Sequence, residues 1–168
     1  MSTLPTVLIS LCLLVVVLAL VAAFTGRRWS PAAAYLPLLS IHFIPGLHLE
    51  PGESLIFWGL AAAIACGINY LLPRDLSTGT VGNGYLCGAA LTGAFVGMLV
   101  STAGIVIGAA AGALLGGIAF SRTPAGHVMR FPSREFVNYL CAKGLPVTVV
   151  VSLAVISIMT IYTEVTLY

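Results

Sequence analysis

Long apolar runs separated by short polar stretches divide the chain into segments of membrane length. A helix that crosses the hydrocarbon core of a bilayer needs about 20 residues, most of them apolar. Five runs come close to this length, and they cover residues 4–24, 54–72, 84–100, 104–120 and 145–162. We therefore predict a membrane-spanning helix in each of them.

Residues 29–49 are apolar as well, but prolines interrupt them. This stretch has no formal charge, and it contains Pro31, Pro37 and Pro45. Proline removes a backbone donor and clashes with the preceding helical turn. Backbone groups left open in lipid must be covered by protein or water. The pattern predicts a broken span or a re-entrant segment that packs against neighbouring helices.

Composition supports a membrane protein and excludes several other classes. Hydrophobic residues make up 60% of the 168 residues and charged residues only 7%, with a mean hydropathy of +1.10. Soluble domains carry about 25% charged residues. A soluble enzyme, a nucleic-acid binder and a disordered tail are therefore excluded. We predict one all-α integral membrane domain over residues 1–168, in contact with the lipid bilayer and with no nucleic acid.

The positions of the charges predict the topology. Loops that hold Lys and Arg prefer the cytoplasm. If residues 29–49 cross the membrane, all seven bases lie on one side, and Glu50, Glu53 and Glu164 lie on the other. Five crossings would instead split the bases two against five. We expect six crossings with both termini on the periplasmic side of a bacterial inner membrane, and a re-entrant 29–49 is the alternative.

Glycines recur at helical spacing in the two runs around the turn at residues 101–104. The expected helix-packing positions are Gly84, Gly88, Gly93, Gly97, Gly104, Gly108, Gly112 and Gly116. Small residues let helix backbones approach closely in lipid, where there is little hydrophobic drive for association. This glycine zipper predicts a helical hairpin. Alternatively, one glycine face packs on a second protomer or lines a narrow conduit, and on this ground we expect a homo-oligomer or a partner in a membrane complex.

The order of these elements resembles a known bacterial membrane family. A proline-broken segment with Pro45-Gly46 and Pro51-Gly52 precedes a helix that ends in Asn69-Tyr70-Leu71-Leu72-Pro73, and the glycine hairpin follows. This order is similar to the family catalogued as domain of unknown function 456, over roughly residues 36–120. The resemblance implies a bacterial inner-membrane fold and no established activity. The chain differs from the family at Asn69, where family members often carry an acidic residue.

The proline-broken segment also holds candidate residues for a solute or proton site. These residues are His42 and His48, together with Asn69 on the next helix. An ionisable group at membrane depth is a functional candidate, and broken helices often form transporter sites. Alternatively, His42 bonds a carbonyl that Pro37 or Pro45 leaves free. Glu50 and Glu53 are expected in the outer headgroup layer.

Residues 121–144 form the predicted cytoplasmic loop. Its candidate contacts to lipid or to a partner are Arg122, His127, Arg130, Arg134 and Lys143. Ser133 is placed to cap a short helix on which Phe136, Val137 and Leu140 share a face. Such an amphipathic helix is typical of one that lies on the inner leaflet, where basic residues meet anionic lipid.

Motifs of catalysis are missing from the sequence. It has no Gly-x-Ser-x-Gly, no His-Glu-x-x-His and no phosphate loop, and its four cysteines have no metal-ligand spacing. We expect no catalytic residues, no metal and no cofactor. The first hypothesis for function is an oligomeric scaffold or accessory subunit. The second is a small-solute or ion channel or transporter that uses residues 37–51, and the third is a lipid-modifying membrane enzyme.

Overall fold

The computed structural model describes residues 3–42, 52–71 and 79–167, and every regular element in these ranges is helical. In chain order the elements are α1 (Thr3–Phe24), α2 (Ser30–His42), α3 (Gly52–Leu71), α4 (Gly79–Met98), α5 (Thr102–Ser121), the 3-10 turn η2 (His127–Met129), α6 (Arg134–Tyr139), the π turn η3 (Leu140–Gly144) and α7 (Leu145–Leu167). The all-helical prediction is therefore confirmed for the described residues.

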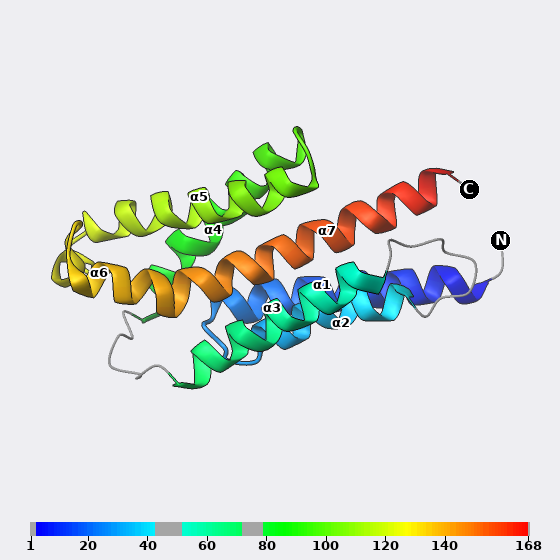
Figure 1. Cartoon of the computed structure of the whole chain (residues 1–168), viewed down its shortest axis with the longest axis horizontal. Helices are drawn as coiled ribbons and strands as arrows, with labels where there is room; N and C mark the ends of the chain where they lie inside the picture. Colours follow the sequence, from blue (N-terminus) through cyan, green and yellow to red (C-terminus); the bar gives the residue numbers. More distant parts are fainter. Residues whose placement is uncertain (1–2, 43–51, 72–78, 168) are drawn as a thin grey trace.

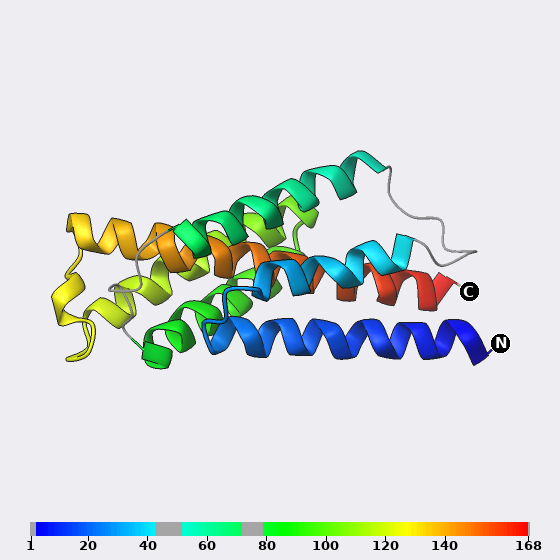
Figure 2. The same ribbon diagram turned by 90° about the horizontal axis from the view of Figure 1, so that it is seen from below.

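Successive long helices alternate in direction along one elongated bundle (Figures 1 and 2). The start of α1 and the end of α7 lie at the same end of this bundle. The opposite end, which we call the basic end, holds the α1–α2 turn and the segment between α5 and α6. The described bases all belong to segments at the basic end, namely Arg27, Arg28, Arg122, Arg130, Arg134 and Lys143.

Four helices of the described residues are long and apolar enough to cross a membrane. They cover Val7–Phe24, Ser54–Leu71, Thr102–Ser121 and Arg134–Thr163. The helix α2 has 13 residues, which is roughly 20 Å at 1.5 Å per residue and less than a hydrocarbon core of about 30 Å. The bounds of α1 and α3 agree with the predicted spans to within two residues.

The helix α2 continues through Pro37 instead of breaking there. Pro37 has no amide donor for the carbonyl one turn earlier, but residues on both sides of it keep helical geometry. The Tyr35 hydroxyl donates to the Leu55 carbonyl at 3.2 Å and ties α2 to α3. The remainder of the predicted segment, residues 43–49, lies outside the described residues.

The core of the bundle is built around α7, which packs against all five of the helices α1 to α5. Seven consecutive residues, 151–157, are buried there, so this helix is apolar on every side, as a central helix must be. Threonines in α7 satisfy their hydroxyls locally. Thr148 donates to the Gly144 carbonyl and Thr160 to the Ile156 carbonyl, both at 2.9 Å.

The helices α4 and α5 form an antiparallel hairpin whose backbones touch. A Cβ added at Gly93 would overlap the Gly108 carbonyl oxygen, and one added at Gly97 would overlap that of Gly104. Ser101 begins α5, because its hydroxyl accepts the Gly104 amide at 3.0 Å, as a helix N-cap does. The helix α4 begins at Gly79, five residues before the predicted span 84–100.

The last helix begins earlier than the sequence pattern indicated. The elements α6, η3 and α7 follow one another without a break (Figure 1). Pro146 lacks the donor for a regular turn, and the wider π turn at Leu140–Gly144 directly precedes it. Residues 134–144 thus continue the last helix, whereas we predicted a separate amphipathic helix there. On α6 the buried residues are Phe136 and Tyr139, and Val137 is exposed.

Candidate functional site

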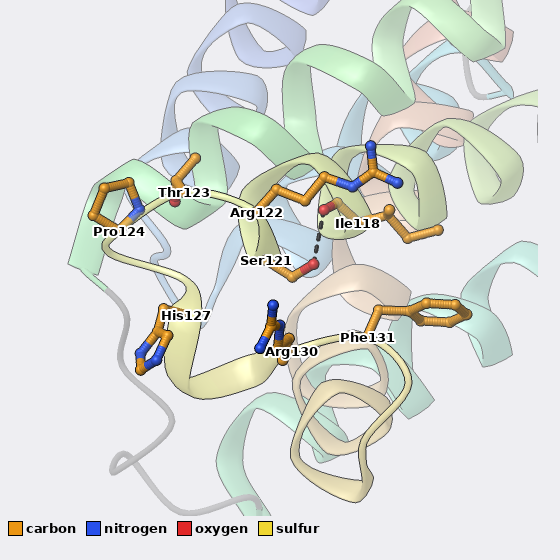
Figure 3. A pocket seen from close by; sticks show the side chains of 8 residues that line it. All are labelled: Ile118, Ser121, Arg122, Thr123, Pro124, His127, Arg130 and Phe131. Carbon is orange, nitrogen blue, oxygen red and sulfur yellow. Dashed lines mark hydrogen bonds between the residues drawn. The ribbon is translucent and has the colours of Figure 1, made fainter.

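A pocket of about 520 Å³ opens at the basic end, where α5 stops and the chain turns toward α6 (Figure 3). It is lined by Ile118, Ser121, Arg122, Thr123, Pro124, His127, Arg130 and Phe131. This volume is in the usual range of small-molecule sites. Its lining combines apolar side chains with three basic ones.

Close contacts between the turn and the end of α5 give the pocket its shape. The Gly126 amide donates to the Thr123 hydroxyl at 3.2 Å and to the Thr123 carbonyl at 3.1 Å. A Cβ at Gly126 would overlap the Phe120 carbonyl oxygen. Glycine is needed at this position for space, since its backbone conformation is an ordinary one. The tight turn places His127 and Arg130 in the same pocket lining as Arg122.

The last carbonyls of α5 have local donors. The Ser121 hydroxyl donates to the Ile118 carbonyl at 2.7 Å. The Arg122 amide donates to the Ala119 carbonyl at 3.2 Å, and the Thr123 hydroxyl donates to the Phe120 carbonyl at 2.7 Å. Helix C-termini often recruit a basic side chain for these groups. Here the Arg122 guanidinium is not needed for that role.

The pocket lining has positive charge without a compensating acid. Among the described residues that line it, none carries a carboxylate. Arg122, His127 and Arg130 are exposed, and Figure 3 shows the Arg130 side chain between His127 and Phe131 in that view. The nearest acid in the sequence of this segment, Glu135, is on α6 and does not line the pocket.

Aromatic side chains hold the pocket against the bundle. Phe120 is fully buried, and its ring centroid lies 5.8 Å from that of Tyr85 on α4 and 5.8 Å from that of Tyr139 on α6. Phe131 packs edge to face on Phe136, with ring centroids 5.2 Å apart. These are favourable aromatic separations, so α4, α5 and α6 meet at one packed junction behind the pocket.

The structure does not bring the predicted solute-site residues together. His42 is the exposed last residue of α2, at the end of the bundle that holds the termini of the chain. Asn69 is near the end of α3, at the basic end, where its amide donates to the Arg28 carbonyl at 3.4 Å. His48 lies outside the described residues. A site shared by His42 and Asn69 is therefore absent from the described part of the chain.

The structure divides the predicted basic contacts into two groups. Arg122, His127 and Arg130 line the pocket together, whereas Arg134 and Lys143 are outside its lining. Arg134 is the exposed first residue of α6, and Lys143 is half-buried in η3. Sequence reasoning found the basic segment. It did not find the pocket, because the turn at Gly126 depends on contacts with Phe120.

Two further polar features were not anticipated from the sequence. Asn83 on α4 is buried against Gly26, where a Cβ would overlap the Asn83 amide nitrogen. Gly26 has φ of +69°, a conformation that favours glycine. In α7 the buried hydroxyls of Ser152 and Ser157 have no hydrogen-bond partner among the described residues.

The described residues hold no group of three His, Cys, Asp or Glu side chains that could bind a metal ion. The four cysteines are free thiols, with Cys12 and Cys87 buried, Cys66 half-buried and Cys141 exposed. No protein-family model, no curated protein and no solved structure matches the chain. The resemblance to domain of unknown function 456 therefore stays a prediction.

Proposed function

We propose that this chain is a scaffold or accessory subunit of a complex in the bacterial inner membrane, without catalytic activity of its own. In this proposal the polypeptide crosses the membrane six times, with α2 and its continuation as the short segment and with the basic end in the cytoplasm. Its partner is a second copy of the chain or another membrane protein. The observations below support this proposal over a carrier.

The observation that supports this proposal most strongly is the lack of charged side chains along the bundle. The helices α1, α3, α4, α5 and α7 contain no Asp, Glu, Lys, Arg or His whose side chain the structure describes. A proton- or ion-coupled carrier ordinarily needs an ionisable group at membrane depth. Close packing of α7 against its neighbours also favours a static support.

The glycines favour a partner surface on α4 and not on the hairpin seam. Gly93, Gly97, Gly104 and Gly108 face the backbone of the opposite helix of the same hairpin. They are therefore occupied within one chain and do not line a conduit. Gly84 and Gly88 have nothing within 4 Å of an added Cβ, so this part of α4 leaves room for a partner helix to approach closely.

The test is the mass and composition of the particle purified in mild detergent. For the wild type we expect a stable oligomer or a stoichiometric membrane partner. Gly88→Leu should lose that partner while the chain stays folded, because a Cβ at this position has no atom of its own bundle within 4 Å. Ala111→Leu is the matched control, since Ala111 is exposed on α5. A monomeric wild-type particle without a partner would contradict the proposal.

The proposed topology predicts the side from which single cysteines are labelled. In a variant whose own cysteines are replaced by alanine, Arg27→Cys and Arg130→Cys should react with an impermeant reagent from the cytoplasmic side. Glu53→Cys should react from the periplasmic side. If residues 29–49 were re-entrant, Arg27→Cys and Glu53→Cys would be labelled from the same side, and the six-segment topology would be wrong.

A small-solute channel or transporter is the second candidate. The buried hydroxyls of Ser152 and Ser157 favour it, because unpaired hydroxyls in the core could bind an uncharged polar solute. In vesicles that contain the purified protein, the scaffold proposal expects no solute flux. A flux that Ser152→Ala abolishes, with the oligomer unchanged, would replace the scaffold with this candidate.

A further inference from the structure

We propose that the pocket between α5 and α6 is a binding site for a phosphate group that is attached to an apolar body. The ligand class is a phosphate ester, supplied either by an anionic phospholipid headgroup or by a soluble metabolite. Only the lipid source rests on the proposed function, since it needs the basic end to lie at the inner leaflet. The pocket itself is independent of the scaffold role.

The basic side chains of the pocket are available for a ligand. Arg122 and Arg130 make no ion pair or hydrogen bond with another described side chain, and the carbonyls of three residues in the last turn of α5 already have donors. Two guanidinium groups whose described neighbours in the lining include no carboxylate attract a phosphate anion, and the planar fork of arginine matches phosphate oxygens. His127 adds a third nitrogen donor to the same lining.

The hydroxyls of the pocket take a different part. The Ser121 and Thr123 hydroxyls donate to the carbonyls of Ile118 and Phe120, respectively. The Thr123 oxygen also accepts a hydrogen bond from the Gly126 amide. They therefore have no proton left for a phosphate oxygen. Binding depends on the arginines and the histidine, so removing the two arginines should remove most of the affinity.

The apolar residues of the lining determine which group attached to the phosphate can bind. Ile118, Pro124 and Phe131 line the pocket beside the basic groups, and Phe131 keeps half of its surface exposed although it packs on Phe136. A cavity of about 520 Å³ is larger than one phosphate ion requires. The site therefore fits a phosphate that carries an apolar organic group, such as an aromatic ring or an acyl chain, and it favours such esters over inorganic phosphate.

The test compares two double variants of the full chain that lose the same charge from the same end. Arg122→Gln/Arg130→Gln removes the pocket arginines. Arg27→Gln/Arg134→Gln removes two exposed arginines outside the lining and is the matched control. Because all four arginine side chains are exposed, both variants should unfold at the same temperature as the wild type in detergent.

Each protein is tested with two probes. In the first arm, the protein in phosphatidylcholine nanodiscs is titrated with phenyl phosphate and with inorganic phosphate by calorimetry. In the second arm, nanodiscs of phosphatidylcholine with one fifth phosphatidylglycerol are used, and native mass spectrometry measures the lipid that stays bound. A soluble source predicts binding in the first arm, and a lipid source predicts retention only in the second.

In whichever arm the wild type binds, we expect the pocket variant to lose at least tenfold in affinity or retention. A base near an anionic surface attracts lipid without any site, so in the lipid arm the control variant should also weaken, but by a clearly smaller factor. Equal losses in the two variants would reduce the effect to general surface charge and overturn the proposal. Absence of binding in both arms would overturn it as well, and neither result would alter the oligomer or partner expected of a scaffold.

Discussion

Replacing Gly108 by alanine should destabilise the protein strongly, although the change adds only one methyl group to the hairpin. The added Cβ would overlap the Gly93 carbonyl oxygen and lie 3.4 Å from the Ala94 amide nitrogen. Since both obstacles are backbone, α4 and α5 would have to move apart along the seam. Overpacking of this kind typically costs about 1–3 kcal/mol, and we expect the upper part of that range.

The matched control is Gly88→Ala, because nothing lies within 4 Å of a Cβ at Gly88. Alanine is a better helix former than glycine by up to about 1 kcal/mol. Gly88→Ala should therefore be neutral or stabilising, although both variants add the same methyl group to the same hairpin. Unfolding is measured for the two proteins by titration with a denaturing detergent, and equal midpoints would show that the seam is not as tight as described.

The second large effect is expected for Phe120→Ala. The ring is fully buried and contacts Tyr85 and Tyr139, so its removal opens a cavity where α4, α5 and α6 meet. Phe→Ala changes in cores cost about 3–5 kcal/mol in soluble proteins. Part of that cost is the lost free energy of transferring the ring out of water. This part is smaller at a junction beside lipid, so we expect Phe120→Ala to cost about 3 kcal/mol.

Leu115→Ala is the control for this change, since Leu115 keeps 63% of its surface exposed on the same helix. It should alter stability by less than about 1 kcal/mol, as changes away from packed features usually do. Detergent-induced unfolding followed by circular dichroism measures both variants. A loss for Phe120→Ala no greater than for Leu115→Ala would mean that the aromatic junction does not hold the hairpin to α6.

Much of the helical architecture could be predicted from hydrophobic runs. The bounds of α1, α3 and α5 follow from apolar length together with their flanking glycine, proline and serine residues. The start of the last helix could not be predicted, because Pro146 is a usual residue of a first helical turn. Only tertiary packing reveals that the chain passes it by a π turn at Leu140–Gly144.

The candidate site was predictable in its chemistry and not in its shape. The cluster of bases between α5 and α6 is visible in the sequence, and Arg122, His127 and Arg130 are part of it. Their arrangement around one cavity depends on the contact of Gly126 with the Phe120 carbonyl. A single glycine in a polar segment does not indicate such a contact, so no periodicity or motif could have identified it.

The unbroken helix from Arg134 to Thr163 has a mechanical consequence. Its 30 residues extend roughly 45 Å, well beyond a hydrocarbon layer of about 30 Å. If this helix crosses such a layer, about one third of it extends outside the hydrocarbon. A continuous helix that tilts in the membrane moves its two ends in opposite directions. A ligand that displaces one end would therefore displace whatever is bound to the other.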